Sequence, residues 1–144
     1  MDSGASRMKV LDIAPDRPKR REFAKWIVNE GHEVVTVPGR REALAHLKSG
    51  QFDLAVLDAT SDLYDVKEFV QEINKGAAKH GEPIIAIVVE PRHRPPRHRI
   101  AGRASNVVFL QDGSVEHMTR IVDLAVSVRD YGGEEDPAEA AEAI

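Results

Sequence analysis

The chain has 144 residues, 42% of them hydrophobic, and a formal net charge of -4 at pH 7. This length suits one domain with a sizeable core, and the mild net charge argues against a protein that binds nucleic acid over its whole surface. The absence of cysteine excludes disulfides, thiol catalysis and thiolate metal sites. No apolar run approaches the ~20 residues of a membrane span, and the first residues lack an apolar signal region, so we expect a cytoplasmic protein.

Short apolar runs and longer amphipathic segments alternate along the chain. The short runs predict strands at residues 8–14, 32–37, 54–58, 83–89 and 106–110. Apolar residues at helical spacing predict helices at residues 17–30, 40–48 and 66–76, and a last helix that begins near residues 112–114. The single tryptophan, Trp26, lies in the first of these helices, and we expect it to pack on the sheet.

The segment at residues 90–99 interrupts the alternation, because its three prolines forbid a normal helix before about Arg97. The remaining pattern predicts right-handed crossovers and a parallel sheet with helices on both faces. We therefore expect an α/β protein with a flavodoxin-like three-layer sandwich, a five-stranded parallel sheet and a short or irregular fourth helix. Residues 1–7 are expected to be a flexible N-terminus, residues 8–131 the folded domain, and residues 132–144 an acidic, disordered tail or linker.

Two aspartates stand out against the apolar strands. Asp58 ends the third strand, at the edge of the sheet where functional crevices lie in open α/β folds. It either caps the turn at residues 60–62 by accepting backbone N–H bonds or acts as a nucleophile or metal ligand. Asp12 interrupts the first strand, which a sheet interior accepts only where the carboxylate is partnered or lies near an edge.

The stretch FDLAVLD at residues 52–58 resembles the strand that leads into the phosphoacceptor aspartate of response regulator receiver domains. The run at residues 34–37, followed by Glu42, Ala43 and Leu44, is also similar to that family, and the order of elements agrees over residues 8–131. The resemblance implies a receiver-type signalling module of a two-component system, which is not an enzyme. It places Asp58 at the phosphorylation position.

Several positions depart from the pattern of that family. The acidic pair that follows the first strand and holds Mg²⁺ in the family is replaced by Ala14 and Pro15, and the acidic residues left nearby are Asp12 and Asp16. Where the family has a hydroxyl residue, the chain has Val88 and Val89. The family's lysine is replaced by Gln111 or Asp112, and its switch aromatic falls on Val108 or Phe109.

These departures remove groups that would stabilise charge. Phosphoryl transfer to a carboxylate depends on a metal ion and on positioned protein charges, so Mg²⁺-dependent phosphorylation should be badly weakened. We therefore predict a pseudo-receiver with no metal site and no cofactor, and the sequence leaves Mg²⁺ binding undecided. Asp58 then persists as a turn cap or as a weak acceptor supported by Asp16 or Asp12. The alternative is a functional receiver that is phosphorylated on Asp58.

A cluster of arginines forms the densest group of charges in the chain. Its members are Arg92, Arg94, Arg97 and Arg99. Guanidinium groups suit bidentate contact with phosphate or carboxylate, so we predict a surface that binds a partner or an anion, and a solvated loop is the alternative. The ligands that fit are an acidic protein face, an anionic nucleotide such as a cyclic dinucleotide, or the chain's own acidic tail.

The resemblance also implies protein partners. These are a histidine kinase or a downstream effector, together with a homodimer through the face formed by the fourth helix, the fifth strand and the last helix. We expect no direct DNA binding and no membrane partner. Because residues 132–144 are similar to a linker, a further alternative is that the chain is the front part of a longer regulator.

Overall fold

The structure is a computed structural model that describes residues 7–15, 17–58, 66–88, 106–110 and 115–131. Its strands are β1 (Lys9–Ile13), β2 (Glu33–Val37), β3 (Leu54–Asp58), β4 (Ile84–Val88) and β5 (Val107–Leu110). Its helices are α1 (Arg17–Asn29), α2 (Arg40–Ser49), α3 (Val66–Gly76) and α5 (Val115–Tyr131). The predicted strands and helices are thus confirmed, whereas the predicted short or irregular fourth helix falls outside the described residues.

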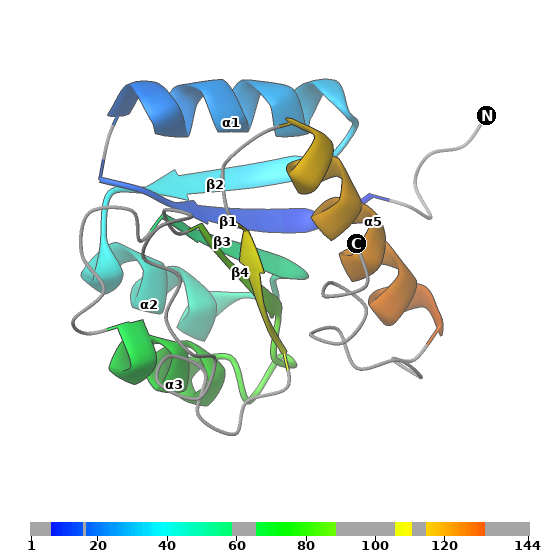
Figure 1. The fold of residues 1–144 in the computed structure, drawn as a ribbon. Coiled ribbons are helices and arrows are strands. Elements are labelled where there is room, and N and C mark those ends of the chain that lie inside the picture. The colour runs from blue at the N-terminus through cyan, green and yellow to red at the C-terminus, as the bar shows by residue number, and fades with distance from the viewer. Residues whose placement is uncertain (1–6, 16, 59–65, 89–105, 111–114, 132–144) are drawn as a thin grey trace.

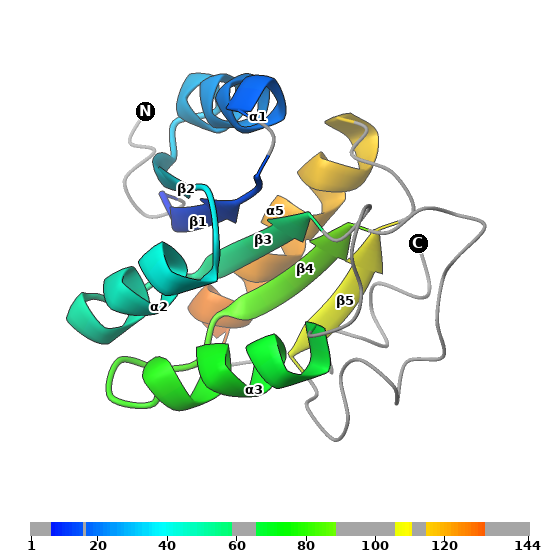
Figure 2. The same ribbon diagram turned by 90° about the vertical axis from the view of Figure 1, so that its left-hand side faces the viewer.

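The five strands form one parallel sheet in the order β2-β1-β3-β4-β5. Helices α1 and α5 cover one face, and α2 and α3 cover the other (Figures 1 and 2). The predicted three-layer α/β sandwich is therefore confirmed. The chain leaves β1 for β2 on one side and then returns to β3 on the other, so the strand order reverses between β1 and β3. In sheets of this kind ligands bind beyond the carboxyl ends of the strands at that reversal.

Side chains alternate between the two faces along each strand, and two apolar cores result. Strand β3 illustrates the division, because Ala55 and Leu57 join the core under α2 and α3, while Leu54 and Val56 join the core under α1 and α5. All four side chains are buried. Polar residues do not alternate with apolar ones along β3 because both faces of the strand are covered, as this run of apolar residues predicted.

Helix α1 ends in a glycine cap that directs the chain into β2. Gly31 has a φ of 89°. Its N–H donates to the carbonyl oxygen of Val28 at 3.0 Å, and the N–H of His32 donates to the carbonyl oxygen of Ile27 at 3.2 Å. This pair of bonds is a Schellman motif, which satisfies carbonyl groups at the helix end and requires a left-handed residue. Glycine adopts that conformation without steric cost.

We predict that Gly31→Ala lowers the free energy of unfolding by about 1–2 kcal/mol, because a Cβ is strained at this φ although no atom lies within 4 Å of it. Urea denaturation measures the change. Gly50→Ala is the matched control: Gly50 is an extended residue with φ -164° that follows α2, and there we expect no loss of stability. Equal destabilisation by the two substitutions would contradict the role of the left-handed conformation.

Helix α1 packs on the sheet through one fully buried side chain and an aromatic pair at its margin. Ile27 is fully buried, whereas Trp26 and Phe23 are half-buried and pack against the same core. The two aromatic rings stack with their centroids 6.1 Å apart. The expectation that Trp26 packs on the sheet is confirmed, and the structure adds that Ile27 is the deeper anchor.

We predict that Ile27→Ala lowers the free energy of unfolding by about 2–5 kcal/mol, as a fully buried aliphatic truncation does. Trp26→Ala should cost less, about 1–3 kcal/mol, since its side chain is only partly buried and the main loss is the contact with Phe23. Thermal unfolding followed by circular dichroism ranks the two variants. A larger loss of unfolding free energy for Trp26→Ala than for Ile27→Ala would show that Trp26 is the main anchor of α1.

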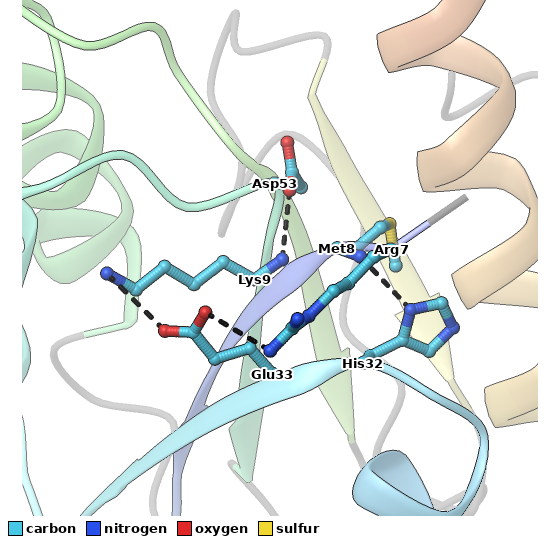
Figure 3. A network of polar contacts seen from close by, with 6 residues as sticks. All are labelled: Arg7, Met8, Lys9, His32, Glu33 and Asp53. Carbon is cyan, nitrogen blue, oxygen red and sulfur yellow. Dashed lines mark hydrogen bonds and ion pairs between the residues drawn. The ribbon is translucent and has the colours of Figure 1, made fainter. Parts of the chain in front are cut away.

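Polar contacts set the register of the strands at the amino-terminal edge of the sheet (Figure 3). The N–H of Lys9 donates to Oδ2 of Asp53 at 2.9 Å, and the N–H of Asp53 donates to the carbonyl oxygen of Lys9 at 2.9 Å. The N–H of Met8 donates to Nδ1 of His32 at 3.1 Å. Glu33 forms ion pairs with Arg7 and Lys9 at 3.9 Å. These contacts hold β1 between its neighbours and so position the opposite edge, where Asp58 lies.

Candidate functional site

Asp58 is the last residue of β3 and lies at the carboxyl edge of the sheet, beside the reversal of strand order. It is half-buried, unlike the four buried residues before it in the strand. In the register of the sheet, Asp58 is opposite Val88 of β4. On its other side, Ile13 of β1 is opposite Leu57, so Ala14, the residue after Ile13, comes next to Asp58. The structure therefore places Asp58 where the sequence predicted it, between β1 and β4.

The residues that flank Asp58 are apolar. Ala14 is 4% exposed and Val88 is 9% exposed. Neither side chain can donate a hydrogen bond or bind a cation, and the N–H of Ala14 is already bonded to the carbonyl oxygen of Val37 at 3.1 Å. At the register positions beside Asp58, the described residues therefore lack the acidic and hydroxyl side chains that the family resemblance calls for.

Asp12 is the second carboxylate near this edge, and it is buried inside the sheet. It is 3% exposed and pairs in register with Thr36 on β2 and Val56 on β3. Since β1 is an interior strand, Asp12 does not lie at a sheet edge, and it does have an interaction partner. Alternation along β1 and β3 puts Asp12 on the same sheet face as Asp58, one pleat deeper.

The described residues do not fit the magnesium site that the family resemblance implies. Among them, no group of three or more His, Cys, Asp or Glu side chains lies close enough together to hold a metal ion. Magnesium requires near-octahedral oxygen coordination, and here Asp58 and the enclosed Asp12 are the carboxylates on this part of the sheet.

Strand β5 offers two different side chains at the position of the switch aromatic. Val108 is 1% exposed and lies in the core under α1 and α5. Phe109 is half-buried and packs against the core on the opposite face, under α2 and α3. Between the two, Phe109 is the aromatic residue and the one with access to solvent.

Several predicted site residues fall outside the described part of the chain. They are Asp16, Val89, Arg92, Arg94, Arg97, Arg99, Gln111 and Asp112. The proposed arginine surface and the lysine position therefore stay predictions. Within the described residues, no helix is long and apolar enough to cross a membrane.

One charged surface was not predicted from the sequence. Arg17, Arg21 and Lys25 are all exposed and follow one another at intervals of four residues along α1. Residues four apart lie on the same side of a helix, so these cations form one row on its outer face. The four-residue spacing of these cations is visible in the sequence, although the arginines at residues 92–99 are more densely clustered.

We predict that Asp58→Asn changes the melting temperature by less than about 3 °C, since a half-exposed carboxylate between apolar neighbours has little like charge to relieve. Differential scanning calorimetry measures the shift. A rise well above this limit would mean that Asp58 is repelled by other carboxylates, as it would be in a complete acidic site.

No protein-family model and no curated protein sequence matches the chain, but solved structures do. The Vibrio cholerae chemotaxis protein CheY4 aligns with a TM-score of 0.64 and 20% identity, over 79% of this chain and 98% of its own. The Thermotoga maritima response regulator TrrA, in complex with Mg²⁺-BeF, aligns with a TM-score of 0.60 and 20% identity, over 82% and 98%. The receiver domain of a Francisella response regulator aligns with a TM-score of 0.66 and 16% identity, over 85% and 99%.

These identities are low, so the likeness concerns the fold. The alignments cover nearly the full length of the three solved chains, so the whole domain is similar to them. The element order and the sheet order β2-β1-β3-β4-β5 are those of the flavodoxin-like class. The chain therefore has the fold of response regulator receiver domains, as the sequence predicted.

Proposed function

We propose that the chain is an atypical receiver domain of a two-component response regulator, which acts through protein contacts with little or no Mg²⁺-dependent phosphorylation. The observation that carries this proposal is the apolar surrounding of Asp58, with Ala14 on one side and Val88 on the other. The fold supports the receiver assignment, and these two neighbours support the atypical variant.

The chemical reason lies in the charge that develops during phosphoryl transfer. The transferring group spreads negative charge over its oxygens, and catalysis consists largely of positioning and of electrostatic stabilisation by metal ions and cations. Ala14 and Val88 supply neither. The carboxylate of Asp58 is itself negative, so without a metal ion or cation to offset this charge it would repel an incoming phosphodonor, and transfer to it would be slow.

A functional phosphoacceptor remains the second candidate, and one observation favours it. Asp12 lies on the same sheet face as Asp58, so a buried carboxylate is available one pleat below the acceptor. In this alternative Asp12, together with Asp16, would take over part of the role of the missing acidic pair. The T. maritima regulator was solved with Mg²⁺-BeF, which gives a direct probe for this candidate.

For the partner contact we propose the arginine cluster Arg92, Arg94, Arg97 and Arg99. Its partner would be a signalling protein, either a histidine kinase or a downstream effector. An anionic nucleotide is the alternative ligand for the same guanidinium groups. We further propose that Phe109, which is half-buried, holds the switch-aromatic position, and this register puts Asp112 at the position of the family's lysine.

The test is a titration of the ¹⁵N-labelled chain with Mg²⁺ and beryllofluoride, followed by amide NMR. We expect no saturable shift at Asp58, Val88 or Ala14. The gain-of-function variant Ala14→Asp, Pro15→Asp, Val88→Thr restores the carboxylates and the hydroxyl, and there we expect saturable shifts at these strand ends.

The control is Asp58→Asn in the same titration, because it removes the acceptor without changing the fold. Saturable shifts in the parent chain that disappear in Asp58→Asn would establish the functional phosphoacceptor and overturn the atypical variant. Shifts that persist in Asp58→Asn arise elsewhere on the protein and leave the proposal standing.

A further inference from the structure

The outer face of α1 carries cations that the described part of the protein does not neutralise. Arg17, Arg21 and Lys25 are exposed, and none of them forms an ion pair or a hydrogen bond through its side chain within the described residues. Together with Pro18 and Glu22 they line a hollow on the surface of the helix. Arg40, in contrast, pairs with Glu68 and Glu72.

The position of these cations along α1 is unfavourable for the helix itself. The first turn of α1 contains no acidic residue and begins at Arg17. The amino-terminal end of a helix carries a partial positive charge that acts within its first turn, so Arg17 is repelled there and an anion would be stabilised. An acidic segment along this face would relieve both the repulsion between the cations and the repulsion of Arg17 by the helix dipole.

The chain itself contains a segment of the complementary charge. Residues 134–142 include Glu134, Glu135, Asp136, Glu139 and Glu142, and no Lys, Arg or His follows Arg129. The last three glutamates of this segment, Glu135, Glu139 and Glu142, are four and three residues apart. This spacing is close to the four-residue interval of the row on α1.

The helix that precedes this segment in the chain packs on the same face of the sheet as α1. Helix α5 ends at Tyr131 and lies on the same side of the sheet as α1, because both helices pack on one core (Figure 2). Eleven residues separate Tyr131 from Glu142. An extended chain covers about 3.3 Å per residue, so Glu142 can lie up to about 36 Å from Tyr131 and Glu135 up to about 13 Å, whereas α1, with 13 residues, is about 20 Å long.

We propose that the outer face of α1, formed by Arg17, Arg21 and Lys25, is a docking surface for an acidic peptide, and that its occupant in this chain is the segment at residues 134–142. The tether makes the contact intramolecular, with an effective concentration on the order of millimolar. A weak ionic contact is therefore populated without an external partner.

The test exploits the absence of cysteine in the natural chain. Ala140→Cys introduces a single thiol, which is labelled with a nitroxide, and the amide signals of the ¹⁵N-labelled protein are compared before and after reduction of the label. We expect paramagnetic loss of amide signal along residues 17–25 at low salt. The loss should vanish near 1 M salt, where the Debye length falls to about 3 Å.

Two charge-changing variants of the labelled protein separate the ionic contact from chance proximity. Reversal of the row, in Arg17→Glu, Arg21→Glu, Lys25→Glu, should restore the amide signals of α1. The matched control reverses three exposed lysines at or near α3, on the opposite layer, in Lys67→Glu, Lys75→Glu, Lys79→Glu, and it should leave the loss in place. A mixture of labelled ¹⁴N protein with unlabelled ¹⁵N protein should show no loss, because the contact lies within one chain.

A third variant controls for the possibility that the reversed row disturbs the folding of α1. Neutralisation of the segment, with its glutamates changed to glutamine and Asp136 to asparagine, leaves α1 intact and should restore the same signals. The proposal is overturned if the signal loss falls on residues 92–103 instead of α1, if it persists after reversal of the row, or if no loss occurs at low salt. Loss in the mixed sample would overturn the intramolecular contact in favour of a contact between two copies.

Discussion

The structure depends on the burial of β3 on both of its faces. Residues Leu54, Ala55, Val56 and Leu57 alternate between two cores, so the strand can exist only between two layers of helices. Removal of apolar surface from water stabilises at roughly 25 cal/mol per Å², and this strand contributes to both cores at once. Helices α1 and α5 cover one face of the sheet. The other face is covered by α2 and α3, which connect successive strands.

The same constraint determines where polar chemistry can occur. A doubly covered strand tolerates a charged residue only at its end, and Asp58 occupies that end on β3. Asp12 is the exception among the described residues, a carboxylate held within an interior strand and 3% exposed. The burial of a carboxylate is costly unless it is partnered, so a carboxylate inside a strand next to β3 is not expected from the composition of typical interior strands.

Electrostatic contacts on the surface are distributed unevenly between the two layers. Arg40 at the start of α2 pairs with Glu68 and Glu72 of α3 and lies 5.8 Å from the ring centre of Phe69, which ties these helices together. The outer face of α1 has cations without such partners among the described residues.

The sequence by itself determined the elements and their order, because the burial pattern of each segment is written in its apolar periodicity. It also placed Asp58 at the carboxyl edge, since a charge that ends an apolar run marks the end of a covered strand. Only the tertiary structure decided that Asp12 lies in an interior strand on the face of Asp58, that Ile27 is buried more deeply than Trp26, and that Phe109 has access to solvent where Val108 has none. These facts depend on strand order and on which face each neighbour covers, and no local pattern in the chain encodes either one.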